Sequence, residues 1–536
     1  MSNMKKLLGL LLCCTSVVGY GQYAGSTSAE VEEIVRASAA TITVSDLRNH
    51  LTTIASDEFE GRETGTEGQR KAANYIAKQF ADLGLPAVGD DGSYFQKISF
   101  ISENWSNIEL NVNGNTLRHL WDYYAYPTDN GDKAATKFDE VLFLGYGIDA
   151  DKYSDYKNVD VTGKAILIYA GEPMGKDSLS HVSGQRGETE WSKDVSKKLS
   201  VAKEKGVAMV FIIDPEFKNN VGIARRTILN RRLKMGWSKN PADNFANNCF
   251  ISTKVAKDII GGQFKKVVKA RKKINKKKKA RSVKLPTDLA LTMEKNVREL
   301  LGENVLGFVE GSDPDKKEEV VVVTAHYDHL GKRGDDIYYG ADDNGSGTSS
   351  VLEVCQAFVE AKKAGNGPKR SVLFMLVSGE EKGLLGSEYY AQHPIFPLAQ
   401  TVANVNVDMV GRVDEKHAEN PNYIYVIGSN RLSTELHEIN EAANTKYTQL
   451  ELDYTYNAES DPNRYYYRSD HYNFAEKGVP AIFYFNGTHD DYHRTSDTVD
   501  KINFEKMANI AKLVFHTSWE LANRADRIKV DVLPKK

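Results

Sequence analysis

The strongest constraint in this sequence is a regular alternation of apolar runs and helical segments, which begins near Glu319 and continues to about Ala522. The apolar runs are continuous and contain no alternating polar residues, as expected for strands that are covered on both faces. We therefore predict an α/β fold with a mixed, mostly parallel central sheet and helices on both faces. The expected strands are 320–324, 372–377, 402–408, 423–427 and 481–485, and the expected helices are 348–360, 385–392, 432–443 and 504–522.

Length and composition set the class of protein. The chain has 536 residues, of which 41% are hydrophobic and 27% are charged. At about 100 to 200 residues per domain, this length predicts two to four compact units and excludes a single small binding module. A net charge of −3 provides no overall field to hold nucleic acid, so no nucleic-acid partner is expected.

The first residues have the pattern of a cleavable signal peptide. Lys5 and Lys6 precede an apolar run over 7–18, and small residues flank Tyr20 before an expected cut near Gly21. The alternative is a membrane anchor, but the run is shorter than the roughly 20 residues that span a bilayer. We therefore expect residues 1–21 to be removed, no stable membrane span, and a secreted or periplasmic protein.

After removal of this leader only Cys249 and Cys355 remain, which is too few for a disulfide framework or a cysteine-based zinc site. We expect Cys355 to lie in a helix with its side chain in the hydrophobic core.

The middle of the chain differs from the rest. A helix preceded by Thr66 and Gln69 as a capping box is expected first, and short β-rich runs separated by glycines then cover 138–214. These runs predict a second domain of mixed strands and short helices. The stretch Lys265–Lys284 is dense in lysine and arginine; we interpret it as a solvated face or linker at the exit from this domain, the alternative being a surface for an anionic partner.

Polar residues that can bind metal follow four successive apolar runs. Because the carboxyl ends of parallel strands lie at one edge of a sheet, we expect these residues to converge. They stand in the segments 324–329, 340–347, 378–381, 408–409 and 489–493. Imidazole and carboxylate ligands without thiolate suit zinc or a similar divalent ion such as cobalt or manganese, and the number of carboxylates suits two ions. Each residue alone has an ordinary interpretation as a cap, a turn or a surface charge; their joint occurrence predicts the metal site.

Five ordered motifs resemble those of the co-catalytic di-zinc aminopeptidases, a family that includes secreted bacterial aminopeptidases and the glutamate carboxypeptidases. The motifs are 325–328, 343–347, 379–381, 406–409 and 492–498. The resemblance covers about 43–100 and 285–522, and the intervening part is similar to the protease-associated domain often inserted in this family. It implies a discontinuous catalytic domain of the zinc-exopeptidase type over 40–109 and 286–525, with the inserted domain over 110–285.

The resemblance also implies roles for single residues. His326 and Asp408 would complete one zinc site, Glu381 and His493 the other, and Asp343 would bridge the two ions. In the same pattern Glu380 matches the general base, Asp328 the carboxylate that orients a ligand imidazole, and Tyr492 a phenol that contacts the substrate carbonyl. The neighbouring Asp342 leaves the bridging assignment open, although the position before Asn-Gly-Ser-Gly favours Asp343.

The family further implies a metallo-exopeptidase with a peptide substrate, and an aminopeptidase that releases N-terminal residues is the expectation. A carboxypeptidase would need cations for a free carboxylate, for which Arg464 and Arg468 are candidates, and a non-catalytic peptide-binding relative is the alternative from another class. In the pocket-like segment 464–472, Tyr467 and His471 are expected to contact substrate, or equally to pack the loop. The oligomeric state stays open.

Overall fold

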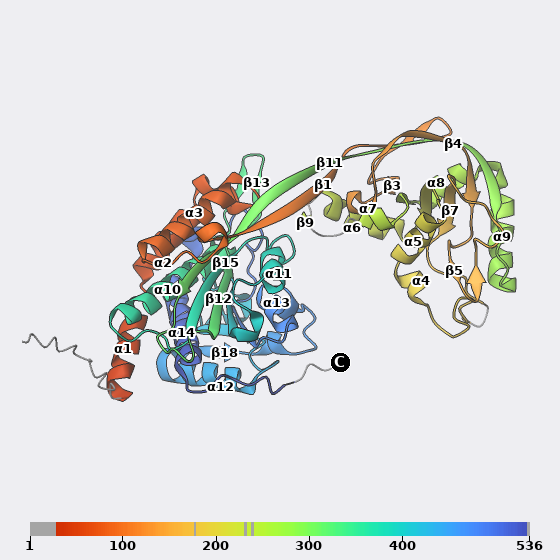
Figure 1. Cartoon of the computed structure of the whole chain (residues 1–536). Helices are drawn as coiled ribbons and strands as arrows, with labels where there is room; N and C mark the ends of the chain where they lie inside the picture. Colours follow the sequence, from red (N-terminus) through yellow and green to blue (C-terminus); the bar gives the residue numbers. More distant parts are fainter. Residues whose placement is uncertain (1–27, 176–177, 230–232, 237–240, 533–536) are drawn as a thin grey trace, which may run out of the picture.

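The computed structural model describes residues 28–175, 178–229, 233–236 and 241–532 (Figure 1). The expected signal peptide over 1–21 lies outside these residues. Within the described part of the chain, none of the helices has the length and apolar character needed to cross a bilayer.

The predicted sheet is present in the C-terminal part of the chain. Its strands, in spatial order, are β18 (Glu451–Asp453), β17 (Tyr423–Ile427), β19 (Ala481–Phe485), β16 (Thr401–Val407), β12 (Val320–His326) and β15 (Ser371–Val377). The neighbours β15, β12, β16 and β19 are parallel to one another, whereas β17 is antiparallel to β19. The fold is therefore a mixed, mostly parallel sheet, and the predicted class is confirmed.

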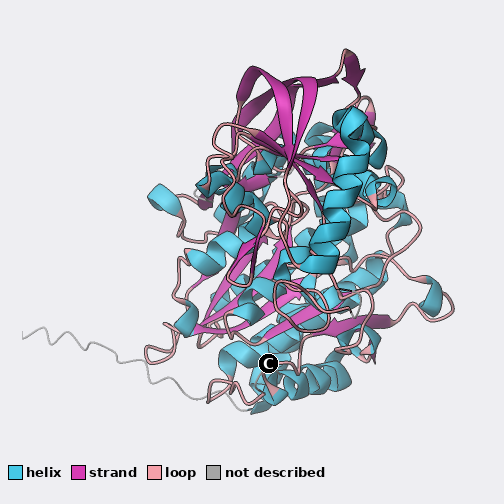
Figure 2. Cartoon of the chain, turned by 90° about the vertical axis from the view of Figure 1, so that its right-hand side faces the viewer, coloured by secondary structure: helices cyan, strands magenta, loops and turns pink. Residues whose placement is uncertain are grey.

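Alternate residues of a central strand enter two different cores. Val321 and Val323 of β12 pack with buried residues of α10 (Gly347–Lys363) and α14 (Phe504–Asn523) on one side of the sheet. On the other side, Val320 and Val322 pack with Tyr390 of α11 (Leu385–Gln392) and Phe474 of α13 (His471–Glu476). Helices therefore cover both faces of the sheet, as the two views show (Figures 1 and 2). The remaining helices on the α14 side are α1 (Ser28–Ala40), α2 (Val44–Ile54), α3 (Glu67–Asp82) and α12 (Thr434–Ala443).

A long antiparallel ribbon joins this part to the rest of the chain. Its strands, β1 (Phe95–Val112) and β11 (Val283–Val309), pair from Phe95 opposite Val305 to Val112 opposite Leu289. One end of β11 pairs with β15, and its other end pairs with β4 (Lys133–Phe143), so the sheet continues beyond the first core (Figure 1). These strands were not predicted from the sequence, because their buried residues are interrupted by charged and exposed ones.

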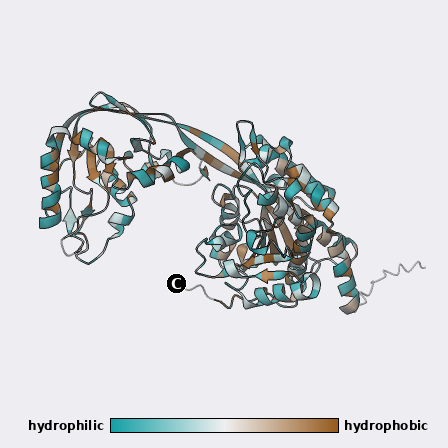
Figure 3. Cartoon of the chain, turned by 180° about the vertical axis from the view of Figure 1, so that it is seen from behind, coloured by the Kyte–Doolittle hydropathy of each residue, from teal (hydrophilic) through white to brown (hydrophobic). Residues whose placement is uncertain are grey.

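The middle of the chain forms its own core around the parallel strands β7 (Ala165–Tyr169), β8 (Met209–Ile213) and β10 (Asn248–Ile251). Cys249 and Cys355 are both free and buried. Of the two expected interpretations of the basic stretch, the solvated face is confirmed and the linker is not. Most of it forms α9 (Phe264–Lys277), which buries Val267, Ala270 and Ile274 and directs its lysines to solvent; Figure 3 colours this helix as largely hydrophilic.

Candidate metal centre

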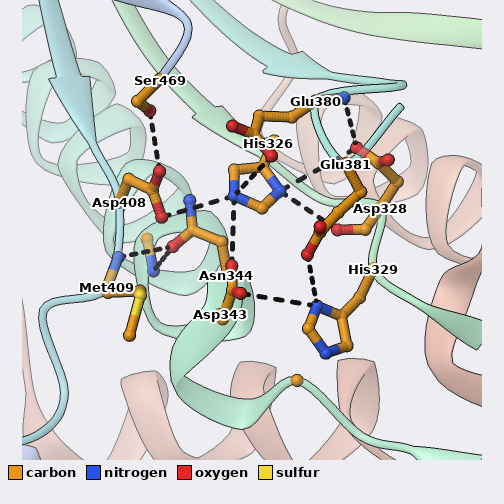
Figure 4. A network of polar contacts seen from close by, with 12 residues as sticks. His326, Asp328, His329, Asp343, Asn344, Glu380, Glu381, Asp408, Met409 and Ser469 are labelled. Atoms are coloured by element: carbon orange, nitrogen blue, oxygen red, sulfur yellow. Dashed lines mark hydrogen bonds and ion pairs between the residues drawn. The ribbon is translucent and has the colours of Figure 1, made fainter. Parts of the chain in front are cut away.

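The polar residues that follow the strands converge at one edge of the sheet, as expected for parallel strands. His326 is the last residue of β12, and Asp408 follows β16 directly. Glu380 and Glu381 stand in the loop after β15, and Asp343 precedes α10. Figure 4 shows these side chains directed toward one another from separate elements.

Two groups of these side chains could each hold a metal ion: the first is His326, Glu380 and Asp408, and the second is His329, Asp343 and Glu381. In the first group, Nε2 of His326 lies 3.3 Å from Oδ1 of Asp408 and 3.8 Å from Oε2 of Glu380. In the second group, Nδ1 of His329 lies 2.9 Å from Oε1 of Glu381. Both groups are largely buried, so their charges are poorly screened by water.

Asp343 lies between the two groups. Its Oδ1 is 3.4 Å from Nε2 of His326, and its Oδ2 is 3.0 Å from Nε2 of His493. His493 is also 3.4 Å from Oε2 of Glu381. The structure thus brings all five sequence-predicted ligands together and adds His329, which sequence reasoning missed although it closes the run 324–329 that contains two other site residues.

Several atoms of the cluster fit a cation better than a hydrogen-bond network. Among the described residues, the buried Nε2 of His326, Oδ2 of Asp343 and Oδ1 of Asp408 have no hydrogen-bond partner. Unsatisfied buried polar atoms are costly, and metal coordination is one way in which such atoms are satisfied. Imidazole nitrogen and carboxylate oxygen form a donor set for zinc and similar divalent ions.

The carboxylates and histidines of the cluster lie close together and shift one another's pKa values. Burial raises the pKa of the Asp343 carboxyl, but the nearby imidazoles of His326 and His493 outweigh burial and hold this pKa well below its usual range. Burial lowers the pKa of His493, yet the carboxylates of Asp343 and Glu381 raise it to about 10. Cations favour the carboxylate form, and a bound metal ion would take over this role from protonated histidines.

Glu380 differs from its neighbour Glu381. Burial raises the pKa of Glu380 well above its ordinary value, and the carboxylates of Glu381 and Asp408 raise it further, against the effect of His326. For Glu381, burial and Asp343 also raise the pKa, but hydrogen bonds with His329 and His493 lower it to about 2. Glu380 is therefore the carboxylate of the pair with the greater tendency to hold a proton.

Backbone contacts fix the loop that carries Asp343. The carboxylate of Asp497 accepts hydrogen bonds from the backbone N–H of Asp342 at 3.0 Å and of Asp343 at 3.1 Å. The side chain of Asp342 is turned away from the cluster, since its Oδ1 accepts a hydrogen bond from the Gly411 N–H at 2.7 Å and its Oδ2 lies 3.2 Å from Nε2 of His489. Of the two adjacent aspartates, only Asp343 thus faces the other ligands.

Asp328 lies beside the cluster but does not contact the imidazole as predicted. Nδ1 of His326 lies 3.1 Å from the backbone oxygen of Asp328, whereas the Asp328 carboxylate is 3.9 Å away. This carboxylate instead accepts hydrogen bonds from the Thr64 hydroxyl at 2.7 Å and from the Glu380 N–H at 3.1 Å. Its side chain therefore orients the loop of Glu380, and its backbone orients His326.

A cavity of about 40 Å³ opens onto these residues. Its walls are formed by Asp343, Glu380, Asp408, Met409, Tyr465, Arg468, Phe483, Phe485, Thr488, Tyr492 and His493. Tyr492 lies in this wall with its ring stacked on His493 at 3.9 Å between centroids.

Tyr467 and His471 do not line this cavity. Tyr467 is 41% exposed and packs against Tyr466 and Tyr472. His471 is fully buried and stacks on Phe483, with 4.8 Å between ring centroids, so it supports a wall of the cavity from behind. Tyr465 and Arg468, from the same segment, line the cavity in their place, because the turn of the short helix at 465–467 points neighbouring side chains in different directions.

The sequence matches known proteins over the part of the chain that carries the cluster. Residues 304–518 match the model of Peptidase family M28. A probable leucine aminopeptidase of Trichophyton verrucosum is 35% identical over 216 residues, which are 39% of this chain and 56% of the relative. Aminopeptidase YwaD of Bacillus subtilis is 27% identical over 234 residues, 42% of this chain and 46% of the relative. The chain thus spans about half the length of these relatives.

A comparison of folds finds a similarity that covers more of the chain than residues 304–518. The solved structure of an aminopeptidase from Aneurinibacillus sp. strain AM-1 superposes with a TM-score of 0.52 at 18% identity, covering 93% of this chain and 98% of that one. At this identity the likeness concerns the fold alone. The sequence match to Peptidase family M28 is confined to residues 304–518, the part of the chain that carries the clustered side chains.

Proposed function

We propose that this protein is a zinc-dependent metallo-exopeptidase, an aminopeptidase that hydrolyses the first peptide bond of a peptide. The observation that carries the proposal is the position of Asp343, with one oxygen toward His326 and the other toward His493. A shared carboxylate between two ligand groups is the arrangement of two-metal hydrolytic sites. The names of the relatives, a probable leucine aminopeptidase and an aminopeptidase, support the same activity.

Two Zn²⁺ ions would be held at this site. His326, Asp408 and Asp343 would bind one ion, and Asp343, Glu381 and His493 the other, with His329 within reach of the second group. Zinc at such a site lowers the pKa of a water molecule and polarises the substrate carbonyl.

The remaining steps fall to side chains that are not needed as ligands. Glu380 would accept the proton of the attacking water at its carboxylate and pass it to the leaving amine, a role that suits a buried carboxyl with a raised pKa. Tyr492, in the wall of the cavity, would donate a hydrogen bond to the carbonyl oxygen as negative charge develops there. The aromatic walls, Tyr465, Phe483 and Phe485, would receive an apolar side chain of the N-terminal residue.

The test is hydrolysis of aminoacyl-p-nitroanilides, with zinc content measured on the same samples. We expect about two zinc ions per chain and, for Glu380→Gln, a kcat lowered by at least 100-fold with zinc retained, because loss of a general base typically costs 10²–10⁴-fold. Glu419→Gln, at an exposed position, is the matched control and should keep wild-type turnover. Wild-type turnover of Glu380→Gln would contradict the role of Glu380 as the base.

A carboxypeptidase is the second candidate, and one observation favours it. Arg468 lines the cavity and could hold a free carboxylate, whereas Arg464 stacks over Tyr467 outside it. Peptides blocked at one terminus separate the two activities: an aminopeptidase cleaves only peptides with a free N-terminus, and a carboxypeptidase only those with a free C-terminus. If the protein binds no metal and cleaves neither kind, it is a non-catalytic peptide-binding relative.

The organisation of the whole chain is part of the proposal. The catalytic domain comprises 40–109 and 286–525, and the protease-associated domain comprises 110–285; two separate hydrophobic cores support this division. We further propose export to the periplasm or the medium with removal of residues 1–21, which N-terminal sequencing of the protein from its host would test.

A further inference from the structure

A buried arginine outside the matched region contacts the loops of the metal centre. Arg62 has no exposed surface, yet its guanidinium forms no ion pair within 4 Å with any carboxylate of the described residues. Its donors go to four backbone oxygens instead: Nε to Tyr327 at 2.8 Å, Nη1 to Ile54 at 2.9 Å and Tyr339 at 2.8 Å, and Nη2 to Gly340 at 2.9 Å.

The acceptors of Arg62 lie next to metal ligands in the sequence. Tyr327 directly follows His326, and Gly340 stands three residues before Asp343. The backbone oxygen of Arg62 also accepts a hydrogen bond from the His329 N–H at 3.2 Å. One side chain and its own peptide therefore connect α2 to both loops that carry ligands before α10.

The residues that follow Arg62 in the sequence contact the third ligand loop, which carries Glu380 and Glu381 after β15. Glu63 forms an ion pair at 2.8 Å with Lys382, the residue after Glu381. The Thr64 hydroxyl donates to the Asp328 carboxylate, which in turn accepts the Glu380 N–H. Residues 61–69, which we call the clasp, thus contact each ligand loop from β12 to the glutamate pair.

The local backbone is built for this close approach. Gly61 has φ +67, and a Cβ there would lie 2.3 Å from the Tyr338 oxygen and 2.5 Å from the Gly331 oxygen. A side chain at this position would push the clasp away from the loop that leads to Asp343. Only glycine adopts this conformation freely and leaves room for the contact.

We propose that Arg62 is a positioning residue of the metal centre, holding the loops of His326, His329 and Asp343 in the geometry that binds metal. The inference rests on the proposed two-metal function. Four hydrogen bonds from one rigid, planar group fix the relative positions of three segments, as residues outside the ligand set do in other metal sites.

The positive charge of Arg62 affects metal affinity in the direction opposite to its positioning contacts. A buried cation near the site repels a metal ion, so removing the charge alone would strengthen metal binding. The positioning role predicts weaker binding after the same change, because the ligand loops lose their common anchor. The sign of the change in affinity therefore distinguishes the two effects.

The experiment measures zinc affinity of chelator-stripped full-length protein by competition with a chromophoric chelator. For Arg62→Met we expect affinity lowered at least 10-fold, the usual loss for residues that orient metal ligands. Arg62→Lys keeps the charge but cannot reach four carbonyls from one ammonium, so it should lie between Met and wild type. Arg70→Met removes an exposed arginine of α3 and should bind like wild type.

A second variant keeps the inference testable if Arg62→Met does not fold. Thr64→Val deletes one hydroxyl contact of the clasp and should lower zinc affinity several-fold while leaving the thermal unfolding of the stripped protein close to that of the wild type. The Co²⁺ absorption spectrum provides a readout of ligand geometry, which we expect to change in Arg62→Met and in Thr64→Val. If wild type binds zinc and the folded variants bind it equally or more tightly, the inference is wrong. If wild type binds no zinc, the proposed function itself fails.

Discussion

At the scale of single residues, burial determines what each polar side chain can do. Among the described residues, His326, Asp343 and Asp408 are buried with unpaired atoms in the cluster, whereas the guanidinium of Arg62 is satisfied by four backbone carbonyls. His471 is one of several buried side chains outside the cluster that have unpaired atoms. Both of its ring nitrogens are buried without a hydrogen-bond partner in the described part of the chain.

This burial gives His471 a measurable pH dependence. Burial lowers its pKa to about 3, so above pH 6.5 the histidine is neutral in both the folded and the unfolded chain. As the pH falls below 6.5, only the unfolded chain takes up a proton there, and the folded state loses about 2 kcal/mol of stability from this group by pH 5.

Replacement of His471 by phenylalanine should remove this loss, because a phenyl ring can keep the stacking on Phe483. Urea unfolding of chelator-stripped proteins at pH 7.5 and pH 5 measures the difference. The decrease in unfolding free energy should be about 2 kcal/mol smaller in His471→Phe than in wild type. His393→Gln, at the surface, should follow the wild type; equal decreases in all three proteins would contradict the prediction.

At the scale of elements, hydrophobic periodicity identified helices and strands wherever one face or both faces are buried. The strands β17 and β19 have the predicted bounds, and β12 extends two residues further than expected, to include His326 itself. The basic stretch was not predicted to form the helix α9, because the apolar stripe of this helix is narrow, with Val267, Ala270 and Ile274 among many lysines.

The apolar stripe of α9 should stabilise the core around β7, β8 and β10. Ile274 has no exposed surface, so Ile274→Ala leaves a cavity and should lower the unfolding free energy by about 2–5 kcal/mol. Lys276→Ala, on the exposed face of the same helix, should change it by less than about 0.5 kcal/mol. Urea unfolding followed by circular dichroism compares the two; similar effects of both substitutions would show that α9 does not depend on its buried stripe.

At the scale of the whole molecule, charges from distant parts of the chain meet in one buried place. Asp343, Glu380, Glu381 and Asp408 come from three loops, and their mutual repulsion opposes folding unless cations compensate it. A metal that binds the folded chain therefore stabilises the molecule as a whole.

Removal of metal should consequently lower the thermal unfolding temperature, and added zinc should restore it. At a zinc concentration of 100 times the dissociation constant the stabilisation is about 2.7 kcal/mol. Differential scanning calorimetry of stripped and reloaded protein measures this effect, with Asp343→Asn, which lacks the shared carboxylate, as the comparison. A rise of the same size in Asp343→Asn would show that zinc stabilises the protein at another place.

The sequence by itself determined the fold class and most elements around the first core, and it predicted five residues that the structure brings together. These predictions follow from local patterns. Continuous apolar runs indicate strands that are buried on both faces, and polar residues at the ends of parallel strands lie at the same edge of the sheet. Only the tertiary structure decided which way neighbouring side chains point and which distant segments touch. It turned Asp343 inward and Asp342 away, placed Tyr465 and not Tyr467 in the cavity, brought His329 to the ligands and seated Arg62 against their loops. Such contacts depend on packing between residues far apart in the chain, for which sequence spacing carries no signal.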